Sequence, residues 1–157
     1  MHIKLIFIGV TNEEYLKVGM NDYFHRLRKY IPIEIIEIKD IKNAKSLSQQ
    51  EIKQKEGHEL MLHISSNDFV VILDNQAKMY SSLEFSQYLQ KKMNIATKQL
   101  IFIVGGAYGF SEELYLRANE KLSISPMTFS HQIIRLLFLE QLYRGFSIIN
   151  HSPYHHE

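Results

Sequence analysis

The chain has 157 residues, with 18 lysines and arginines against 17 aspartates and glutamates, which gives a formal net charge of +1. An apolar fraction of 45% and a charged fraction of 22% exclude a disordered chain. The near-neutral balance gives no sign of a strongly basic nucleic-acid-binding protein, and the absence of cysteine excludes a disulfide framework and a thiolate site. We expect one domain over residues 1-157.

Cellular location is also constrained. A chain without cysteine suits a reducing cytosol, and the residues after Met1 lack the pattern of a secretory signal. No apolar run approaches the ~20 residues of a membrane helix. We therefore expect a cytoplasmic protein with no membrane partner.

The first third of the chain predicts a strand, a helix and a second strand. The apolar run from Ile3 to Val10 is typical of a strand. Thr11 to Glu14 matches a capping box, which predicts a helix that extends to about Tyr30. Ile33 to Ile38 alternates in part and predicts the second strand. The polar segment from Lys39 to Leu47 predicts a mobile loop.

The middle third predicts a strand between two helices. Ser48 to Glu51 is a second capping box, and its helix is expected to end near Ile64. Phe69 to Asp74 is continuously apolar up to its last residue, as expected for a strand covered on both faces. Ser81 to Glu84 is a third capping box and opens a helix to about Met93.

The last third completes an alternating pattern. Gln99 to Val104 predicts the fourth strand, a short helix follows from Ser111, and a fifth strand lies near Lys121 to Ser125. The final helix spans roughly Ser130 to Ile149. This alternation predicts a single α/β domain with a mostly parallel sheet and helices on both faces.

Glycines follow the end of the fourth strand. Gly105 and Gly106 carry no Cβ atoms, so a ligand can approach their backbone closely, although an ordinary tight turn is the alternative. Ligands of open α/β sheets lie beyond the carboxyl ends of strands, and Leu73 stands at another such end. The loop lacks the Lys-Ser/Thr of a P-loop after Gly109, and the first strand ends in a lone Gly9, so no dinucleotide fingerprint is present.

The connection into the final helix is unusual. Ile124 to Phe129 is largely apolar yet contains Pro126, so its backbone cannot all pair within a sheet. Exposed backbone groups there suit a ligand with a flat ring and polar edges, and a plain buried loop is the alternative. The final helix carries an apolar stripe interrupted by Arg135 and Arg144, which is expected to be core or a dimer interface.

Four motifs occur together in order and at matching spacings, and Lys55-Glu56-Gly57 accompanies them. They are Gly105 to Phe110, Leu122 to Gln132, Glu140 to Gly145 and Pro153 to His155. Over its full length the chain resembles the ribosomal RNA large subunit methyltransferase H family (RlmH), the smallest of the SPOUT methyltransferases.

The resemblance implies both a fold and an activity. It implies methyl transfer from S-adenosylmethionine to N3 of a pseudouridine in 23S rRNA within the assembled ribosome, with no metal. It also implies a C-terminal trefoil knot, which general topology rules do not predict, and a homodimer whose partner subunit completes the active site. The coenzyme contacts of the family carry over onto Leu73, Gly105, Ile124, Ser125, Pro126, Met127, Thr128 and Phe129.

The acceptor nitrogen carries a proton that must be removed before methyl transfer. A histidine suits this task near neutral pH, and we expect His155 to be the base. Tyr154 would stack on or bond to the acceptor base, and Arg144 would steady the developing negative charge. His131 is the alternative base, although a histidine at a helix start is more often structural.

The chain departs from the family pattern at a few positions. Ser130 replaces a common proline but is itself a good N-cap, and His156 replaces a common arginine or lysine. Two other functions remain open, a SPOUT methyltransferase acting on tRNA and a non-catalytic adenosine-binding module associated with ribosomes. Because the net charge is so small, we expect an RNA enzyme of this kind to need the surface of a whole ribosome and to ignore a naked hairpin.

Overall fold

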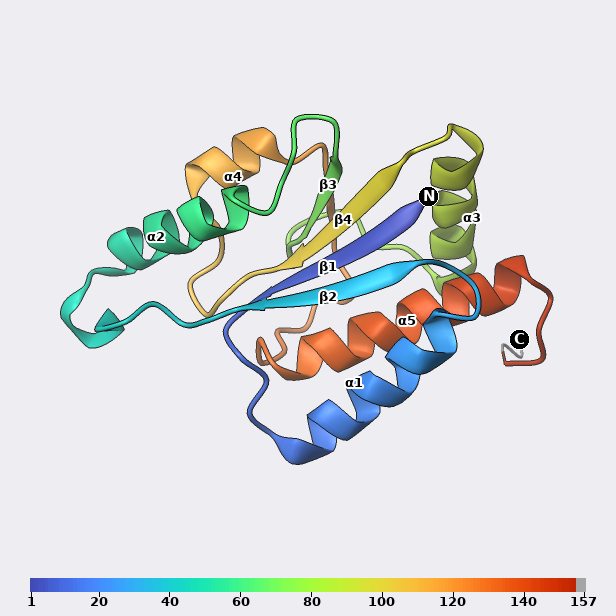
Figure 1. Ribbon diagram of the computed structural model, residues 1–157, viewed down its shortest axis with the longest axis horizontal. Coiled ribbons are helices and arrows are strands. Elements are labelled where there is room, and N and C mark those ends of the chain that lie inside the picture. The colour runs from blue at the N-terminus through green and yellow to red at the C-terminus, as the bar shows by residue number, and fades with distance from the viewer. Residues whose placement is uncertain (155–157) are drawn as a thin grey trace.

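A five-stranded sheet forms the centre of the computed structural model, which describes residues 1–154 (Figure 1). The strands lie in the order β2-β1-β4-β3-β5, and every pairing between them is parallel. Their bounds are β1 His2–Ile8, β2 Ile33–Ile38, β3 Phe69–Leu73, β4 Gln99–Val104 and β5 Glu120–Leu122. The expected α/β fold with a parallel sheet is confirmed.

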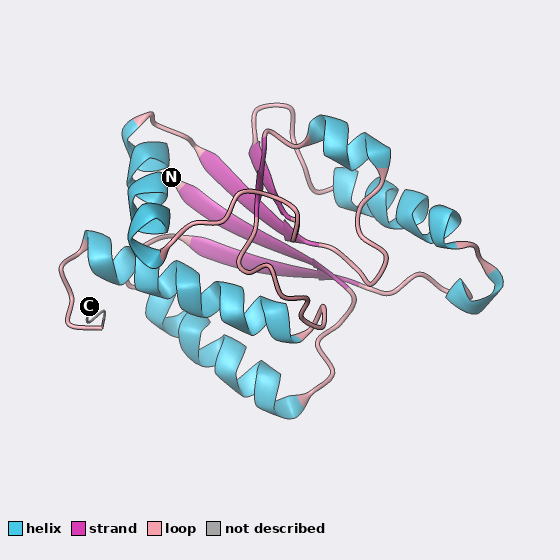
Figure 2. Ribbon diagram, turned by 180° about the vertical axis from the view of Figure 1, so that it is seen from behind, coloured by secondary structure: helices cyan, strands magenta, loops and turns pink. Residues whose placement is uncertain are grey.

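Helices cover both faces of the sheet, as Figures 1 and 2 show from opposite sides. The helices are α1 Glu14–Leu27, α2 Gln49–Met61, α3 Ser82–Asn94, α4 Glu112–Arg117 and α5 Ile133–Ile149, with a short 3-10 helix at Ala44–Ser46. Helix α5 packs between α1 and α3 on one face, and α2 packs with α4 on the other.

Alternate residues of the central strands feed two separate cores. Leu5 and Phe7 of β1 pack with Phe138 of α5, whereas Ile6 and Ile8 face the helices α2 and α4. Since side chains along a strand point to opposite faces, burial on both sides requires apolar residues at nearly every position. This explains the continuous apolar runs.

Three of the predicted helix starts are confirmed. Ser48 and Ser81 each form a complete capping box, and the Ser111 hydroxyl accepts a hydrogen bond from the Leu114 N–H at the start of α4. Helix α5 begins three residues later than expected, but the Ser130 hydroxyl still accepts the N–H of Ile133 at 3.2 Å. Serine at this position therefore does satisfy a backbone group of the first turn.

The capping box expected at Thr11 is wrong. Helix α1 starts at Glu14, and no side chain caps it. The Thr11 side chain is buried and instead hydrogen-bonds to the Glu37 carboxylate and to the Arg135 guanidinium at 2.8 Å. A buried charge needs hydrogen-bond partners more than a helix end does, because the helix end can be hydrated.

Strand β5 is shorter than expected, and the segment after it turns toward the loop that follows β3. The Ser123 N–H donates to the Lys78 carbonyl at 2.9 Å, and the Asp74 N–H donates to the Leu122 carbonyl at 2.9 Å. These bonds place Ser123 and its neighbours beside the end of β3. Among residues 1–154, no helix is long and apolar enough to cross a membrane.

Candidate functional site

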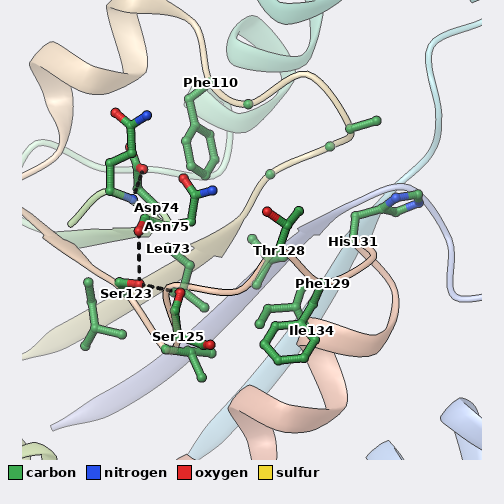
Figure 3. Close-up of a pocket in the computed structure, with 18 of the residues that line it drawn as sticks. Leu73, Asp74, Asn75, Phe110, Ser123, Ser125, Thr128, Phe129, His131 and Ile134 are labelled. Atoms are coloured by element: carbon green, nitrogen blue, oxygen red, sulfur yellow. Dashed lines mark hydrogen bonds between the residues drawn. The ribbon is translucent and has the colours of Figure 1, made fainter. Parts of the chain in front are cut away.

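A pocket of about 370 Å³ opens at the carboxyl ends of β3, β4 and β5 (Figure 3). Three chain segments surround it: the loop after β3, the glycine loop after β4 and the segment 122–129. The structure thus brings together most of the residues expected to bind a coenzyme, namely Leu73, Gly105, Ile124, Ser125, Met127, Thr128 and Phe129. Pro126 is not among the lining residues and lies within the bend that carries its neighbours there, so its contact with a coenzyme stays a prediction.

The glycine loop is shaped by the ring of Phe110. A Cβ atom at Gly105 would lie 2.8 Å from a ring carbon of Phe110, so the aromatic ring packs directly on the glycine backbone. Gly109 closes the loop in a left-handed conformation with φ +81°, which favours glycine. The Phe110 ring also meets the Tyr115 ring edge-on, with centroids 5.9 Å apart. An aromatic wall results on this side of the pocket.

The segment 122–129 offers polar groups on the opposite side. The buried Ser123 hydroxyl donates to the Ser125 carbonyl at 3.0 Å, and the Ser125 hydroxyl accepts the Met127 N–H at 3.0 Å. Within residues 1–154, the backbone N–H groups of Ile124 and Thr128 have no hydrogen-bond partner. An aromatic wall with free backbone donors opposite it fits an adenosine-like ligand, and the volume is within the range of small-molecule sites.

A carboxylate marks the end of β3 within the pocket. Asp74 accepts the Tyr115 hydroxyl at 2.8 Å and the Gln76 N–H at 2.9 Å. Burial, assisted by the hydrogen bond to Asp74, raises the pKa of Tyr115 to about 12. The phenol therefore stays neutral and acts as a hydrogen-bond donor.

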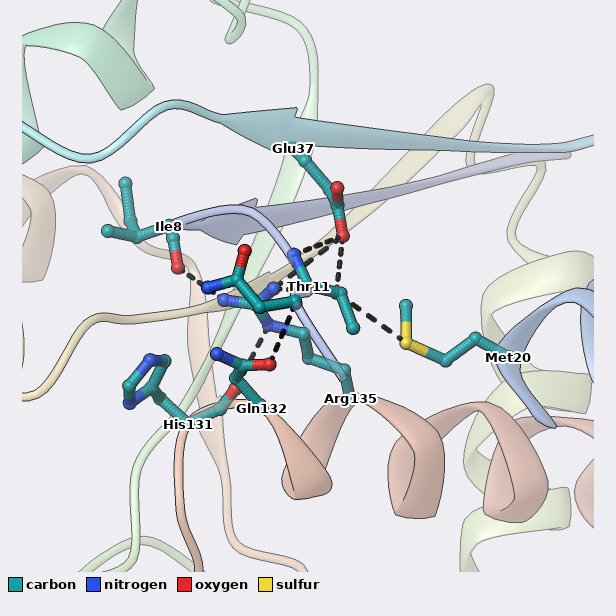
Figure 4. A network of polar contacts seen from close by, with 8 residues as sticks. Ile8, Thr11, Met20, Glu37, His131, Gln132 and Arg135 are labelled. Atoms are coloured by element: carbon teal, nitrogen blue, oxygen red, sulfur yellow. Dashed lines mark hydrogen bonds and ion pairs between the residues drawn. The ribbon is translucent and has the colours of Figure 1, made fainter. Parts of the chain in front are cut away.

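Arg135 anchors the start of α5 to the sheet (Figure 4). It is fully buried, and its guanidinium donates to the carbonyls of Ile8 at 2.5 Å and His131 at 3.0 Å. Its Nη1 lies 3.6 Å from the Glu37 carboxylate. Burial lowers the pKa of Arg135, and Glu37 and Asp40 oppose that shift. In the sequence, Arg135 appeared only as an interruption of the apolar stripe, and this charge among apolar residues was the available signal of its role.

His131 lies at the junction of these parts. It lines the pocket, and the carbonyl of the same residue is held by Arg135. Among the described residues, no group of three or more histidine, cysteine, aspartate or glutamate side chains could hold a metal ion.

Of the expected catalytic residues, Arg144 lies on α5 and Tyr154 lies beyond the end of that helix. Arg144 forms an ion pair with Glu140 at 2.6 Å, and the Tyr154 hydroxyl donates to the same Glu140 oxygen at 3.1 Å. The Arg144 guanidinium also lies 4.9 Å from the centre of the Tyr154 ring. We call these three residues the C-terminal cluster. His155 and His156 are outside the described residues.

The C-terminal cluster does not line the pocket of Figure 3. A neighbouring cavity of about 400 Å³ between α3 and α5 is lined by Glu140, and it shares Ser125 and Phe129 with that pocket. Glu140 was missed in the sequence, although it stands four residues before Arg144, the spacing of a helical ion pair. Burial and the hydrogen bonds to Tyr23 and Glu140 raise the pKa of Tyr154.

Comparison with known proteins gives matches along nearly the whole chain. A family model described as "Predicted SPOUT methyltransferase" matches residues 1–155. Proteins named "Ribosomal RNA large subunit methyltransferase H" from Parabacteroides distasonis and Flavobacterium johnsoniae are each 50% identical over 157 residues, covering 100% of both chains. One of the same name from Christiangramia forsetii is 49% identical over 156 residues, or 99% of each chain. The chain belongs to the SPOUT methyltransferase family.

Proposed function

We propose that this chain transfers a methyl group from S-adenosylmethionine to N3 of a pseudouridine in 23S rRNA within the assembled ribosome. Full-length relatives at about half identity support a ribosomal RNA substrate, because their names state methyl transfer to the large-subunit RNA. One observation carries the donor site: the glycine loop and the segment 122–129 meet in one pocket of about 370 Å³.

The donor supplies a methyl group that its sulfonium already activates, so the chain has to bind and orient the donor and to exclude water from the site. Leu73 and Gly105 would face the adenosine from the strand ends. The free N–H groups of Ile124 and Thr128 would hydrogen-bond its polar edges, and Met127 and Phe129 would cover it. Pro126 would keep the bend in place.

The acceptor nitrogen requires a base and a group that stabilises negative charge. We assign proton removal to His155, which follows directly on Tyr154. Glu140 orients Arg144 and Tyr154 by accepting hydrogen bonds from both. Because this cluster does not line the donor pocket of its own chain, we propose a cytoplasmic homodimer in which one subunit supplies the donor and its partner the C-terminal cluster. The trefoil knot would be formed by the segment after β5.

A labelling experiment tests this function. S-adenosylmethionine with a radiolabelled methyl group is supplied with ribosomes, isolated subunits, tRNA and a naked 23S hairpin. We expect label in 23S rRNA of the ribosome and negligible label in the hairpin, because a near-neutral protein gains little from phosphates alone. Label in tRNA would favour the tRNA enzyme, and donor binding without any label would favour the non-catalytic module.

A further inference from the structure

A second cavity, of about 250 Å³, lies next to the donor pocket at the same edge of the sheet. It opens where β1 and β2 end, and Ile8 and Asp40 line it there. Gly106, Ala107 and His131 line both cavities, so the glycine loop and the start of α5 form their common wall.

Glu56 of α2 forms part of the lining of this second cavity, and its carboxylate lies flat against the glycine loop. A Cβ atom at Gly106 would be 2.8 and 2.9 Å from the two carboxylate oxygens. The next residue, Gly57, packs equally closely on Ser111 at the other end of the loop. Two consecutive residues of α2 thus fix the carboxylate on the loop that separates the cavities.

The Glu56 carboxylate is incompletely satisfied. The residue is only 9% exposed, and no residue of the part that the structure describes donates a hydrogen bond to its Oε2. Burial, with a smaller contribution from Asp40, raises the pKa of Glu56 to about 7. An unpaired buried carboxylate is costly, so a cationic ligand would gain from meeting it.

The second carboxylate of the cavity, Asp40, is exposed to solvent and lies near a positive charge. A Cβ atom at Gly9 would lie 2.8 Å from Asp40 Oδ1 and 3.4 Å from Nη2 of Arg135, so Asp40 and the buried guanidinium adjoin the same glycine. The other titratable residues that line the cavity are Lys45, Tyr108 and His131. Of the two carboxylates that line the cavity, Glu56 is therefore the buried one, and water compensates it less than it compensates Asp40.

We propose that this second cavity receives the amino-acid end of S-adenosylmethionine and that Glu56 accepts a hydrogen bond from its ammonium group. The proposal rests on the proposed function. An ammonium has three N–H donors and a positive charge, which match a carboxylate that lines the cavity and has an oxygen without a donor. Adenosine in the first pocket would need a neighbouring space for the amino-acid end, and the two cavities adjoin at Gly106, Ala107 and His131.

Calorimetric binding of two donor analogues tests this assignment. S-adenosylhomocysteine retains the ammonium, whereas 5′-methylthioadenosine lacks the amino-acid end altogether. We expect Glu56→Gln to weaken the affinity for S-adenosylhomocysteine by about 10-fold or more and to leave the affinity for 5′-methylthioadenosine unchanged. Glu59→Gln, on the exposed part of the same helix, should change neither.

If Glu56→Gln weakened the affinity for both ligands equally, the inference would be overturned, since the residue would then only shape the loop. An unchanged affinity for both ligands would overturn it as well. If the unaltered protein bound neither ligand, the proposed function itself would fail.

A second measurement uses the unaltered protein. As the pH rises from about 6 to about 8, deprotonation of Glu56 should increase the affinity for S-adenosylhomocysteine relative to that for 5′-methylthioadenosine. The same increase in Glu56→Gln would assign it to another group and overturn the proposal.

Discussion

The Nε of Arg135 donates to the His131 carbonyl at 3.0 Å, and this bond ties the first turn of α5 to the wall shared by both cavities. The same guanidinium reaches the Ile8 carbonyl at the end of β1. One buried side chain therefore connects the sheet, the glycine-loop region and the final helix.

Replacing Arg135 should destabilise the protein strongly. Arg135→Met leaves the Glu37 carboxylate without its ion-pair partner and two carbonyls without their donor, which we expect to lower the free energy of unfolding by about 3 kcal/mol. Urea denaturation measures this change. Arg28→Met, at an exposed position on the end of α1, serves as the control and should cost under about 0.5 kcal/mol. Similar losses in both variants would contradict the anchoring role.

Two glycines of the same loop should respond differently to alanine. At Gly105 the added methyl group collides with Phe110, so Gly105→Ala should displace that ring and weaken the affinity for S-adenosylhomocysteine at least about 10-fold. At Gly109 nothing lies within 4 Å, but φ is +81°, so Gly109→Ala should mainly cost about 1 kcal/mol of stability. Calorimetric titration and thermal melting separate the two effects. Unchanged affinity in Gly105→Ala would show that Phe110 does not shape the ligand site.

Glu56 should make stability depend on pH. Its pKa is about 7 in the folded protein against an ordinary value of 4.5, so the folded state binds the proton more tightly. The contribution of Glu56 to stability is thus full below pH 4.5 and is lost as the pH rises through about 7.

Glu56→Gln, which resembles the neutral acid, should raise Tm at about pH 8 by roughly 2–4 °C, corresponding to about 1 kcal/mol, and should change it little at about pH 5. Differential scanning calorimetry of both proteins at the two pH values gives the comparison. A variant that is destabilised at the higher pH would show that the carboxylate is favourably solvated.

The C-terminal cluster should affect transfer and not donor binding. Glu140→Gln removes the charge that holds Arg144 and Tyr154, so we expect methyl transfer to ribosomes to fall at least about 10-fold while affinity for S-adenosylhomocysteine stays within about 2-fold. Single-turnover labelling and calorimetry provide the two numbers. Loss of donor affinity alone would place Glu140 in the donor site, through the cavity that it lines.

Elements specified by neighbouring residues were predictable from the sequence. Ser48 and Ser81 meet their glutamate partners within one turn, so both helix starts were correct. Thr11 has the same local pattern, but Arg135 and Glu37 compete for its hydroxyl from distant positions, and no single-sequence pattern contains that competition.

The pocket was predictable in outline because parallel strands end at one edge of a sheet. The meeting of Gly105 with the segment 122–129 follows from that rule together with the family resemblance. The second cavity was not predictable, because Glu56 lies on α2 among other charged residues. Only the packed structure shows that Gly57 meets Ser111 and that Glu56 is buried.

Helix α5 sets a fixed separation within one molecule. Its 17 residues form a rod roughly 25 Å long, which Arg135 fastens at one end and the Glu140–Arg144 pair stiffens toward the other. Such a rod does not shorten when a ligand binds. Chemistry that needs groups from both of its ends at one point would therefore draw them from two molecules, as in the proposed homodimer.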